Sequence, residues 1–312
     1  MTSTGAKGTK NHAASVRARL LQHAKRHGHD FQRVLTRYAI ERLLFRLGQT
    51  EGAERYVLKG AMLFATWPEH PFRTTGDLDL LGHGDPGPDA IKALFSRVCA
   101  VDLLVDGIAF EAGTLEVDAV REDQKYQGVR VIVVAALDKA RIHVQVDIGF
   151  GDSVHPHPTK QTFPALLPDL PAPSLLMYPR ETVVAEKFEA MISLGETNTR
   201  LKDFYDLWAM TRTASFELSM LVEAVGGTLR RRETPVPIDF PAGLSGSFAI
   251  IVATRGLWSG FLRRSPPTPP APTFPDLQAD LRKFFGRVIA GLALPEGARG
   301  RWDKVAGAWS EP

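Results

Sequence analysis

Cysteine is nearly absent, since the 312-residue sequence contains only Cys99. A single thiol excludes an internal disulfide framework and a metal site built from cysteines, and its apolar neighbours favour a small core residue without a catalytic role. No run of about 18 apolar residues is available to cross a bilayer, and the N-terminal MTSTGAKGTKNHAAS lacks the apolar stretch of a secretory signal. We therefore expect a soluble, cytoplasmic protein.

Net charge is also low, because 38 Lys and Arg nearly balance 35 Asp and Glu to give +3. The distribution is uneven, since residues 1–50 contain ten basic side chains against two acids, Asp30 and Glu41. A basic leading segment would attract a polyanion such as nucleic acid. The alternative is an Arg-rich helical face that only contacts solvent, and charge alone favours that alternative.

Hydrophobic periodicity predicts helices at both ends of the chain. Residues 1–12 lack periodicity and are expected to be disordered. Apolar side chains at three- and four-residue spacings predict two amphipathic helices between residues 13 and 48, with a break at Gly28–Asp30. The same spacing predicts further helices at about 89–101, 179–195, 199–212 and 274–292.

Strand patterns occupy the middle of the chain. A short strand or loop leading into a helix is expected at residues 55–67, and a strand at residues 75–82. Three segments rich in β-branched residues predict an antiparallel meander: 113–123, 129–139 and 141–152. The proline-rich segment Arg263–Pro275 is expected to be an extended surface connector.

Three aspartates on two predicted strands are the candidate metal ligands. Asp77 and Asp79 are two residues apart, so they share one strand face, where their like charges need a cation or a donor. Asp147 ends a polar stripe on a later strand. Magnesium prefers a few carboxylates together with phosphate and water oxygens. An exposed edge-strand pair and, for Asp147, a cap of the GFGD turn are the alternatives.

Basic and glycine residues near these acids suit a phosphate group. Gly60 stands where a strand would pass into a helix, so its backbone could approach a phosphate. Lys187 falls on the apolar face of a predicted helix, where it either snorkels to solvent or neutralises a triphosphate. Arg73 could pair with the acids or bind a phosphate, because its planar guanidinium suits both.

Other polar groups have simpler interpretations. Asp203 and Asp206 share a helical face, and Lys202 and Asp206 are spaced for an ordinary surface salt bridge. Arg230–Arg232 are expected to solvate a helix end, although contact with nucleic acid is the alternative. His155 and His157 are expected to be loop histidines, because no partner ligand for zinc is evident.

Five segments in order resemble one protein family: VLKGAMLF, RTTGDLDL, VDIGFGD, AEKFEAM and RLKDFYDLW, preceded by RYAIERLLFRL. The chain is similar to the AbiEii/AbiGii abortive-infection toxins, bacterial nucleotidyltransferases of the DNA polymerase beta superfamily. The resemblance covers nearly all of the chain and is only general after about Ala214. One element departs, because Ala61 stands where family members often carry a second glycine, which makes the loop less permissive.

The resemblance implies an α+β fold in three parts. Residues 1–50 would be a disordered tail and basic helices packed on the core. Residues 51–180 would form a polymerase-beta-type nucleotidyltransferase core, a mixed β-sheet with flanking helices. Residues 181–312 would be a mostly helical C-terminal lobe.

The resemblance also implies roles for the candidate residues. Catalysis would involve Asp77, Asp79, Asp147, Lys187 and Asp203, with the first three holding Mg²⁺ or, alternatively, Mn²⁺. The nucleotide would be bound by Lys59, Gly60, Arg73, Lys187 and Lys202. Asp147 would be either a metal ligand or the base that activates the acceptor hydroxyl.

The expected activity is transfer of NMP from an NTP to RNA, with the tRNA 3′ end as the favoured acceptor, which would block translation and growth. The family also implies a cognate antitoxin of the winged-helix, DNA-binding kind. One alternative is a nucleotidyltransferase that modifies a small molecule or a protein hydroxyl. The other is a non-catalytic regulatory protein in which the acids only form ion pairs.

Overall fold

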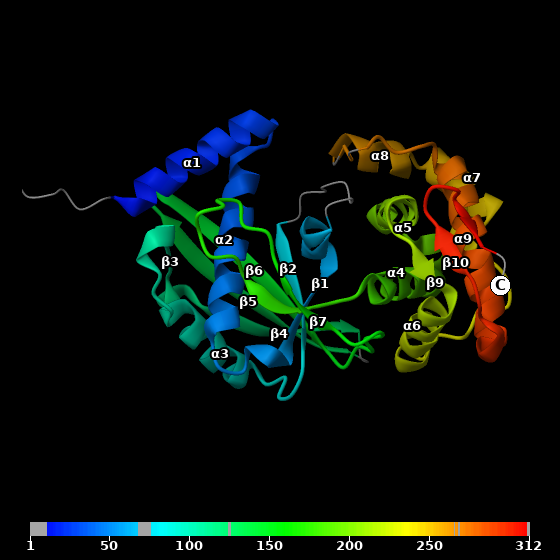
Figure 1. Cartoon of the computed structure of the whole chain (residues 1–312), viewed down its shortest axis with the longest axis horizontal. Helices are drawn as coiled ribbons and strands as arrows, with labels where there is room; N and C mark the ends of the chain where they lie inside the picture. The colour runs from blue at the N-terminus through cyan, green and yellow to red at the C-terminus, as the bar shows by residue number, and fades with distance from the viewer. Residues whose placement is uncertain (1–10, 68–75, 124–125, 265, 268, 311–312) are drawn as a thin grey trace, which may run out of the picture. The chain divides into compact units, whose positions relative to one another are not determined.

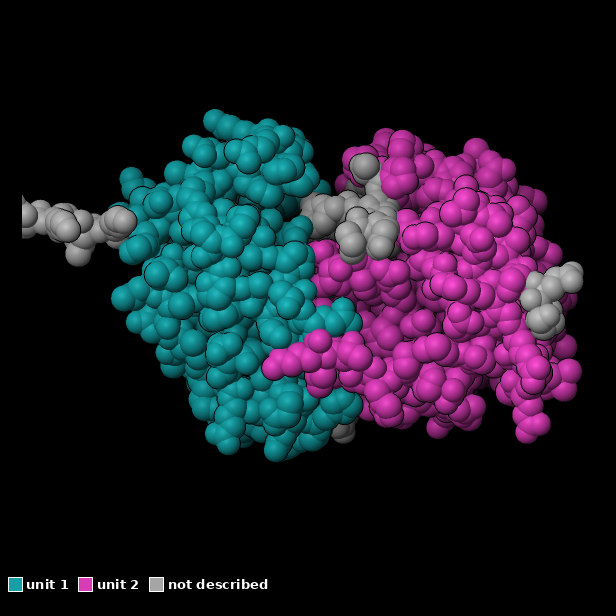
Figure 2. Space-filling model, in the orientation of Figure 1, with its two compact units in different colours: residues 1–56, 75–150, 161–175 teal, residues 57–74, 151–160, 176–312 magenta. Residues whose placement is uncertain are grey.

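The chain divides into two compact units. The structure, a computed structural model, describes residues 11–67, 76–123, 126–264, 266–267 and 269–310. Unit 1 comprises residues 1–56, 75–150 and 161–175, and unit 2 comprises residues 57–74, 151–160 and 176–312 (Figure 2).

Unit 1 is built on a mixed β-sheet with the strand order β3–β5–β6–β2. These strands are β3 (Ile108–Phe110), β5 (Tyr126–Leu137), β6 (Ala140–Phe150) and β2 (Asp77–Gly82), and β4 (Glu116–Asp123) also pairs with β5. Strands β3, β4 and β6 run antiparallel to β5, whereas β2 runs parallel to β6. The successive strands β4, β5 and β6 confirm the predicted meander.

A tight turn sets the register between β5 and β6. Leu137 pairs with Ala140, so Asp138 and Lys139 form a two-residue turn, and Asp138 has φ 52°. Two-residue hairpin turns require this left-handed conformation, which aspartate tolerates better than most residues. The turn fixes every cross-strand pair of the hairpin, including Arg130 opposite Asp147.

Three α-helices lie within the described residues of unit 1. The predicted helices of the first fifty residues are α1 (His12–His27) and α2 (Phe31–Gln49), and α3 (Pro88–Ala100) follows β2. Gly28 ends α1 with φ 66°, and the Asp30 carboxylate accepts a hydrogen bond from the Arg33 N–H to begin α2. In Figure 1, α2 and α3 lie against one side of the sheet.

A buried ion pair fixes α2 to the segment that precedes β3. Arg46 Nη1 lies 2.7 Å from Asp106 Oδ2, and both side chains are at most 2% exposed. The guanidinium also donates to the carbonyls of Val101 and Ile108. Buried charges need this degree of pairing, because removing either partner leaves the other uncompensated. The 3₁₀ turns of unit 1 are η1 (Ala53–Arg55), η3 (Leu104–Asp106) and η4 (Ala112–Thr114).

Three short strands begin in one unit and end in the other. They are β1 (Tyr56–Lys59), β7 (Thr159–Thr162) and β8 (Ser174–Met177). In unit 2, Val57 and Leu58 of β1 pair in parallel with Leu176 and Met177 of β8. The 3₁₀ helix η2 (Gly60–Thr66) follows β1 directly, where a strand or loop leading into a helix was predicted.

Unit 2 is mostly helical, and it contains the helices predicted at about 179–195, 199–212 and 274–292. Its helices are α4 (Arg180–Leu194), α5 (Leu201–Thr213), α6 (Leu218–Arg231), α7 (Gly246–Thr254), α8 (Leu257–Arg264) and α9 (Phe274–Ala293). Aromatic rings fill its core, where Phe188 of α4 stacks on Phe285 of α9 with centroids 4.0 Å apart. The predicted connector Arg263–Pro275 is too long, because its ends belong to α8 and α9.

A small antiparallel sheet in unit 2 was not predicted. Its strands, in the order β11–β10–β9, are β9 (Phe216–Glu217), β10 (Arg301–Asp303) and β11 (Ala308–Trp309). Trp302 is 2% exposed, and its ring meets those of Phe284 and Trp309. The remaining 3₁₀ turns are η5 (Gly195–Thr197), η6 (Ala242–Leu244) and η7 (Pro295–Gly297). Within the described residues, no helix has the length and apolarity of a membrane span.

Candidate active site

The candidate carboxylates of unit 1 lie on two adjacent parallel strands. Asp79 of β2 pairs in register with Asp147 of β6, and Asp77 pairs with Gln145. Side chains that pair in register point to the same face of a sheet, so all three aspartates share one face. Leu78 and Leu80 point the other way and are fully buried. Asp77 is exposed, whereas Asp79 and Asp147 are half-buried.

Asp147 is held by two neighbouring polar side chains. Arg130 of β5 donates from Nε to Oδ1 at 2.7 Å and from Nη2 to Oδ2 at 3.2 Å, and Gln145 Nε2 donates to Oδ2 at 2.8 Å. This two-pronged contact supplies a positive charge next to the carboxylates. Sequence reasoning missed Arg130, although a two-residue turn at Asp138–Lys139 would have placed it opposite Asp147.

The side-chain oxygens of Asp77, Asp79 and Asp147 are the type of ligand that magnesium prefers. They are carboxylate oxygens, and magnesium is usually bound by one or two carboxylates that share it with phosphate and water oxygens. In the part of the chain that the structure describes, no three or more His, Cys, Asp and Glu gather closely enough to hold a metal ion by themselves. A bound ion would therefore need further ligands from a substrate and from water.

Lys187 of unit 2 is buried between two aspartates. It lies on α4 and is 15% exposed, and its Nζ is 2.5 Å from Asp203 Oδ1 and 3.0 Å from Asp206 Oδ2, both on α5. The ammonium also lies 5.8 Å from the centre of the Phe64 ring in η2. Lys187 is therefore not a solvent-directed lysine, and it is next to Asp203, another predicted site residue.

Charges of opposite sign control the ionisation of this group. Burial lowers the pKa of Lys187, but the carboxylates of Asp203 and Asp206 outweigh it and raise the pKa above its usual value. Burial acts in the opposite direction on Asp203, whose pKa is nevertheless lowered by Lys187 and Arg200. Lys187 and Asp203 therefore stay ionised over the physiological range.

Asp206 does not belong to a surface salt bridge. Its side chain is fully buried and contacts Lys187, whereas Lys202, its predicted partner, is exposed. The prediction was wrong because helical spacing identifies neighbours on one helix but not the lysine that α4 presents from outside. Arg73, predicted to bind the nucleotide, lies outside the described residues.

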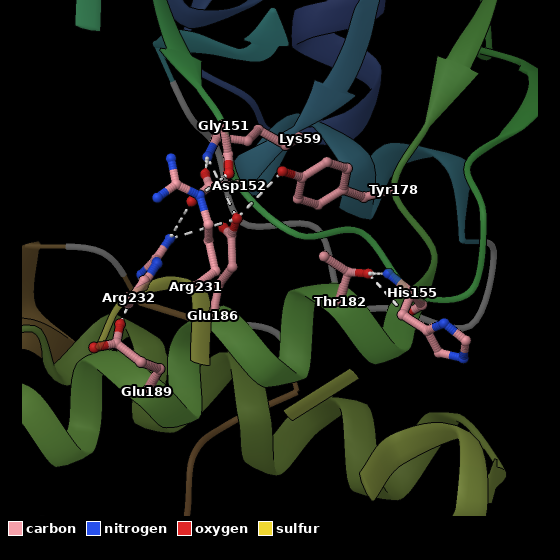
Figure 3. Close-up of polar contacts among 10 residues, drawn as sticks. All are labelled: Lys59, Gly151, Asp152, His155, Tyr178, Thr182, Glu186, Glu189, Arg231 and Arg232. Carbon is pink, nitrogen blue, oxygen red and sulfur yellow. Dashed lines mark hydrogen bonds and ion pairs between the residues drawn. The ribbon is translucent and has the colours of Figure 1, made fainter. Parts of the chain in front are cut away.

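Lys59 stands at the start of η2 in a second buried cluster of charges. Its Nζ lies 2.7 Å from Asp152 Oδ2 and 3.4 Å from Glu186 Oε1 (Figure 3). The Tyr178 hydroxyl donates to Glu186 Oε1 at 3.2 Å, and the Lys59 ammonium lies 5.7 Å from the Tyr178 ring centre. Gly60 follows with φ 73°, a conformation that glycine adopts without strain.

Arg232, at the end of α6, bridges the acids of this cluster. Its Nη1 lies 2.7 Å from Glu189 Oε2, and its Nη2 lies 3.3 Å from Asp152 Oδ1 and 3.5 Å from Glu186 Oε1 (Figure 3). Arg231 donates to the carbonyl of Gly151. The expectation that Arg230–Arg232 solvate a helix end was wrong for Arg232, because spacing does not show which helix end meets buried acids.

The pKa values in this cluster are strongly perturbed. Burial opposes ionisation of Asp152, but Lys59 and Arg232 outweigh it and lower its pKa to about 2. Burial raises the pKa of Glu186, assisted by the neighbouring Asp152 charge. For Lys59, burial lowers the pKa, and the charges of Glu186 and Asp152 reverse that effect and raise it. A proton in this cluster is therefore held by Glu186 in preference to Asp152.

His155 belongs to a loop, as predicted. Its backbone N–H donates to Thr182 Oγ1 at 3.0 Å, and that hydroxyl donates to the His155 carbonyl at 2.9 Å (Figure 3). The ring Nε2 lies 3.0 Å from a carboxylate oxygen of Glu223. These contacts secure the chain after β6 to the first turn of α4.

The candidate residues belong to both units. Asp77, Asp79 and Asp147 share one sheet face in unit 1, where carboxylate oxygens are available to a divalent cation. In unit 2, Lys59 precedes η2 and Lys187 contacts Phe64 of η2, and each lysine is buried with two carboxylates. Metal-binding oxygens and lysines beside a glycine turn are the groups that phosphoryl transfer requires.

The match to one family model agrees with this chemistry. A family model described as a nucleotidyl transferase AbiEii toxin of a type IV TA system matches residues 42–281. No curated protein matches the chain. A crystal structure of a proposed nucleotidyltransferase from H. pylori is 15% identical with a TM-score of 0.46, and the alignment covers 85% of this chain and 97% of that chain. The crystal structure of JHP933 from Helicobacter pylori is 16% identical with a TM-score of 0.41, covering 75% and 98%.

Proposed function

The chain belongs to the AbiEii family of nucleotidyl transferase toxins of type IV toxin–antitoxin systems, and from this membership we propose that it transfers NMP from an NTP to RNA. The main support is the register of β2 and β6, which pairs Asp79 with Asp147 and keeps Asp77 on the same face. Carboxylates arranged in this way suit divalent cations that are shared with a triphosphate.

In the proposed reaction, the acceptor hydroxyl attacks the α-phosphorus of the NTP. A new P–O bond forms to the acceptor, the bond to the bridging oxygen breaks, and pyrophosphate leaves. Asp77, Asp79 and Asp147 would hold Mg²⁺, which would neutralise charge on the phosphates. Asp147 would either complete the metal site or accept the proton of the hydroxyl, and in either role it must exchange its contact with Arg130.

Unit 2 would bind the triphosphate. Gly60 offers backbone N–H groups at the start of η2, and Lys187 supplies a buried positive charge, with Asp203 fixing the direction of its ammonium. Lys59, Lys202 and Arg73 complete the proposed nucleotide-binding set. Because a loose phosphoryl transition state needs little covalent help, positioning and charge neutralisation would supply most of the rate.

A basic corner at the junction of α1 and α2 supports an RNA acceptor. The ring centroids of His23, His27 and His29 lie 4.3 to 6.2 Å apart, and Lys25 and Arg26 are exposed in the same turn of α1. Burial and then the neighbouring cationic groups lower the pKa of His23 and of His29. Because the positive charges of this corner repel one another, a polyanion such as an RNA backbone bound there would relieve the repulsion.

The family implies an NTP substrate and a cognate antitoxin. We propose a winged-helix, DNA-binding antitoxin and the 3′ end of tRNA as the acceptor, a modification that would stop translation. Such substrates place the reaction in the cytoplasm.

The test is transfer of label. Purified protein is incubated with magnesium, each α-labelled NTP in turn and total RNA, at rising salt concentrations. We expect labelled RNA with one or more NTPs, and yields that fall steeply with salt, because phosphate contacts dominate RNA affinity. Label on a small molecule or on protein, with little salt dependence, would replace RNA as the acceptor. No transfer at any salt concentration would refute the proposed activity.

A further inference from the structure

We propose that Arg232, through Asp152 and Glu186, is a positioning residue that holds Lys59 and the first turn of η2 in place for the nucleotide. The NTP substrate is taken from the proposed function, and all the contacts concerned lie within unit 2. Residues from four separate segments make them: the end of β1, the chain after β6, the middle of α4 and the end of α6 (Figure 3).

The Lys59 ammonium makes two ion pairs within this cluster. Asp152 and Glu186 accept from it at 2.7 and 3.4 Å, and Tyr178 places its ring below the charge and its hydroxyl on Glu186. An ammonium has three donors, and two of them are already directed at carboxylates. Lys59 would therefore act less as a mobile phosphate ligand than as an anchor for the backbone that follows it.

That backbone is the part expected to meet the phosphates. Gly60 directly follows Lys59, has φ 73° and begins η2. Further along η2, Phe64 lies beneath the Lys187 ammonium at 5.8 Å. The helix η2 is thus attached at its start by Lys59 and in its middle by Phe64, and a shift of Lys59 would move Gly60, the residue that we propose lies close to the phosphates.

Arg232 is the group on which the position of Lys59 depends. The cluster contains three carboxylates, Asp152, Glu186 and Glu189, whose side chains are 10%, 19% and 6% exposed. Arg232 contacts all three, at 2.7 to 3.5 Å. Among the described residues, Lys59 and Arg232 are the cations that contact Asp152 and Glu186. Without Arg232, these carboxylates would repel one another more strongly and would move, and Lys59 would move with them.

Stability alone does not explain such a cluster. Replacing buried ion networks with well-packed apolar side chains is often neutral or stabilising, so their presence is weak evidence for a purely structural role. Directional pairing instead fixes one geometry, which a nucleotide site needs and a core does not. The pKa of Glu186 is raised by burial and then by the charge of Asp152. As pH rises, ionisation of Glu186 therefore adds a negative charge beside Lys59.

The test compares Arg232→Met with the matched control Arg230→Met, because Arg230 is exposed on the same helix. We expect Arg232→Met to raise the KM for NTP by about tenfold or more, and to change kcat much less, since the carboxylates of unit 1 are untouched. Arg232→Lys should restore part of the loss. A KM unchanged in Arg232→Met, or raised equally in Arg230→Met, would overturn the proposal.

A second measurement does not depend on catalysis. Amide hydrogen exchange of residues 57–66 should become about tenfold faster in Arg232→Met and stay unchanged in Arg230→Met. Equal exchange in both variants overturns the positioning role even if the enzyme is active. Faster exchange in a protein without any transferase activity would refute the proposed function and leave the anchoring of η2 standing.

A third variant covers the case in which Arg232→Met does not fold. Glu186→Gln keeps the size of the side chain and removes its titration. In the wild-type protein, KM should rise with pH as Glu186 ionises between Lys59, Asp152, Tyr178 and Arg232, and in the variant this rise should disappear. The same pH profile in both proteins would contradict the proposal.

Discussion

Replacing Lys187 with methionine should destabilise unit 2 strongly. The substitution keeps an unbranched side chain on α4 but removes the ammonium that Asp203 and Asp206 both contact. Breaking a buried ion pair from one side costs about 3–5 kcal/mol, because the remaining charge is left uncompensated. Both contacts of Lys187 are buried, because the side chains of Asp203 and Asp206 are 4% and 0% exposed, and we expect a cost of about 3 kcal/mol.

Urea unfolding at neutral pH measures this cost. Lys202→Met is the control, because Lys202 is exposed on α5, and it should change the free energy of unfolding by no more than about 0.5 kcal/mol. The losses in Lys187→Met and Asp206→Asn should not add, because both substitutions remove the same contact, and the double variant should lose at least about 1 kcal/mol less than their sum. A loss below about 1 kcal/mol in Lys187→Met, or additive losses in the double variant, would show that the lysine is not the counter-ion of these acids.

The remaining predictions concern pH dependence and backbone geometry. The pKa of Asp152 is lowered to about 2 from its usual 3.8, so its stabilising contribution is fully present above about pH 4 and is lost as pH falls towards 2. Comparing acid unfolding of the wild-type protein with that of Asp152→Asn should therefore give a difference of about 2 kcal/mol at neutral pH that vanishes near pH 2, and a difference independent of pH would contradict the assignment. Gly28 and Gly107 have almost the same φ, 66° and 65°, but a Cβ on Gly28 would meet open space, whereas one on Gly107 would lie 2.7 Å from the Cα of Ala13. Gly28→Ala should lower the free energy of unfolding by about 1–2 kcal/mol, because alanine disfavours the left-handed conformation. Gly107→Ala should lower it by at least about 1 kcal/mol more, because its Cβ would also meet Ala13. Equal melting temperatures of the two variants would refute the contact with Ala13.

The elements that could be predicted are those whose pattern lies within one continuous segment. Strands β5 and β6 alternate in polarity and are joined by a two-residue turn, so both the strands and their antiparallel pairing follow from local sequence. Strands β9, β10 and β11 contain two or three residues each, too few for any period. They are held by rings such as Trp302 and Phe284 that only the packing of α9 brings together.

The candidate site divides in the same way. The shared face of Asp77 and Asp79 follows from strand alternation, and the buried face of Lys187 follows from helical spacing. The partners of Lys187 could not be assigned, because they come from α5 and the choice between Lys187 and Lys202 depends on helix packing. Asp152 and Glu186 contact both Lys59 and Arg232, and these four residues come from four segments of the chain. No spacing in the sequence relates these segments.

We propose that nucleotidyl transfer depends on the carboxylates of β2 and β6, which would hold the metal ions, and Asp77→Asn tests this most directly. The variant is compared with Glu116→Gln, an exposed carboxylate on β4 of the same sheet, in the labelled-NTP and RNA assay, with the melting temperature of each protein measured in parallel. We predict that Asp77→Asn loses transfer by at least about a hundredfold at an unchanged melting temperature, while Glu116→Gln retains it. Full transfer by a folded Asp77→Asn protein would contradict the account.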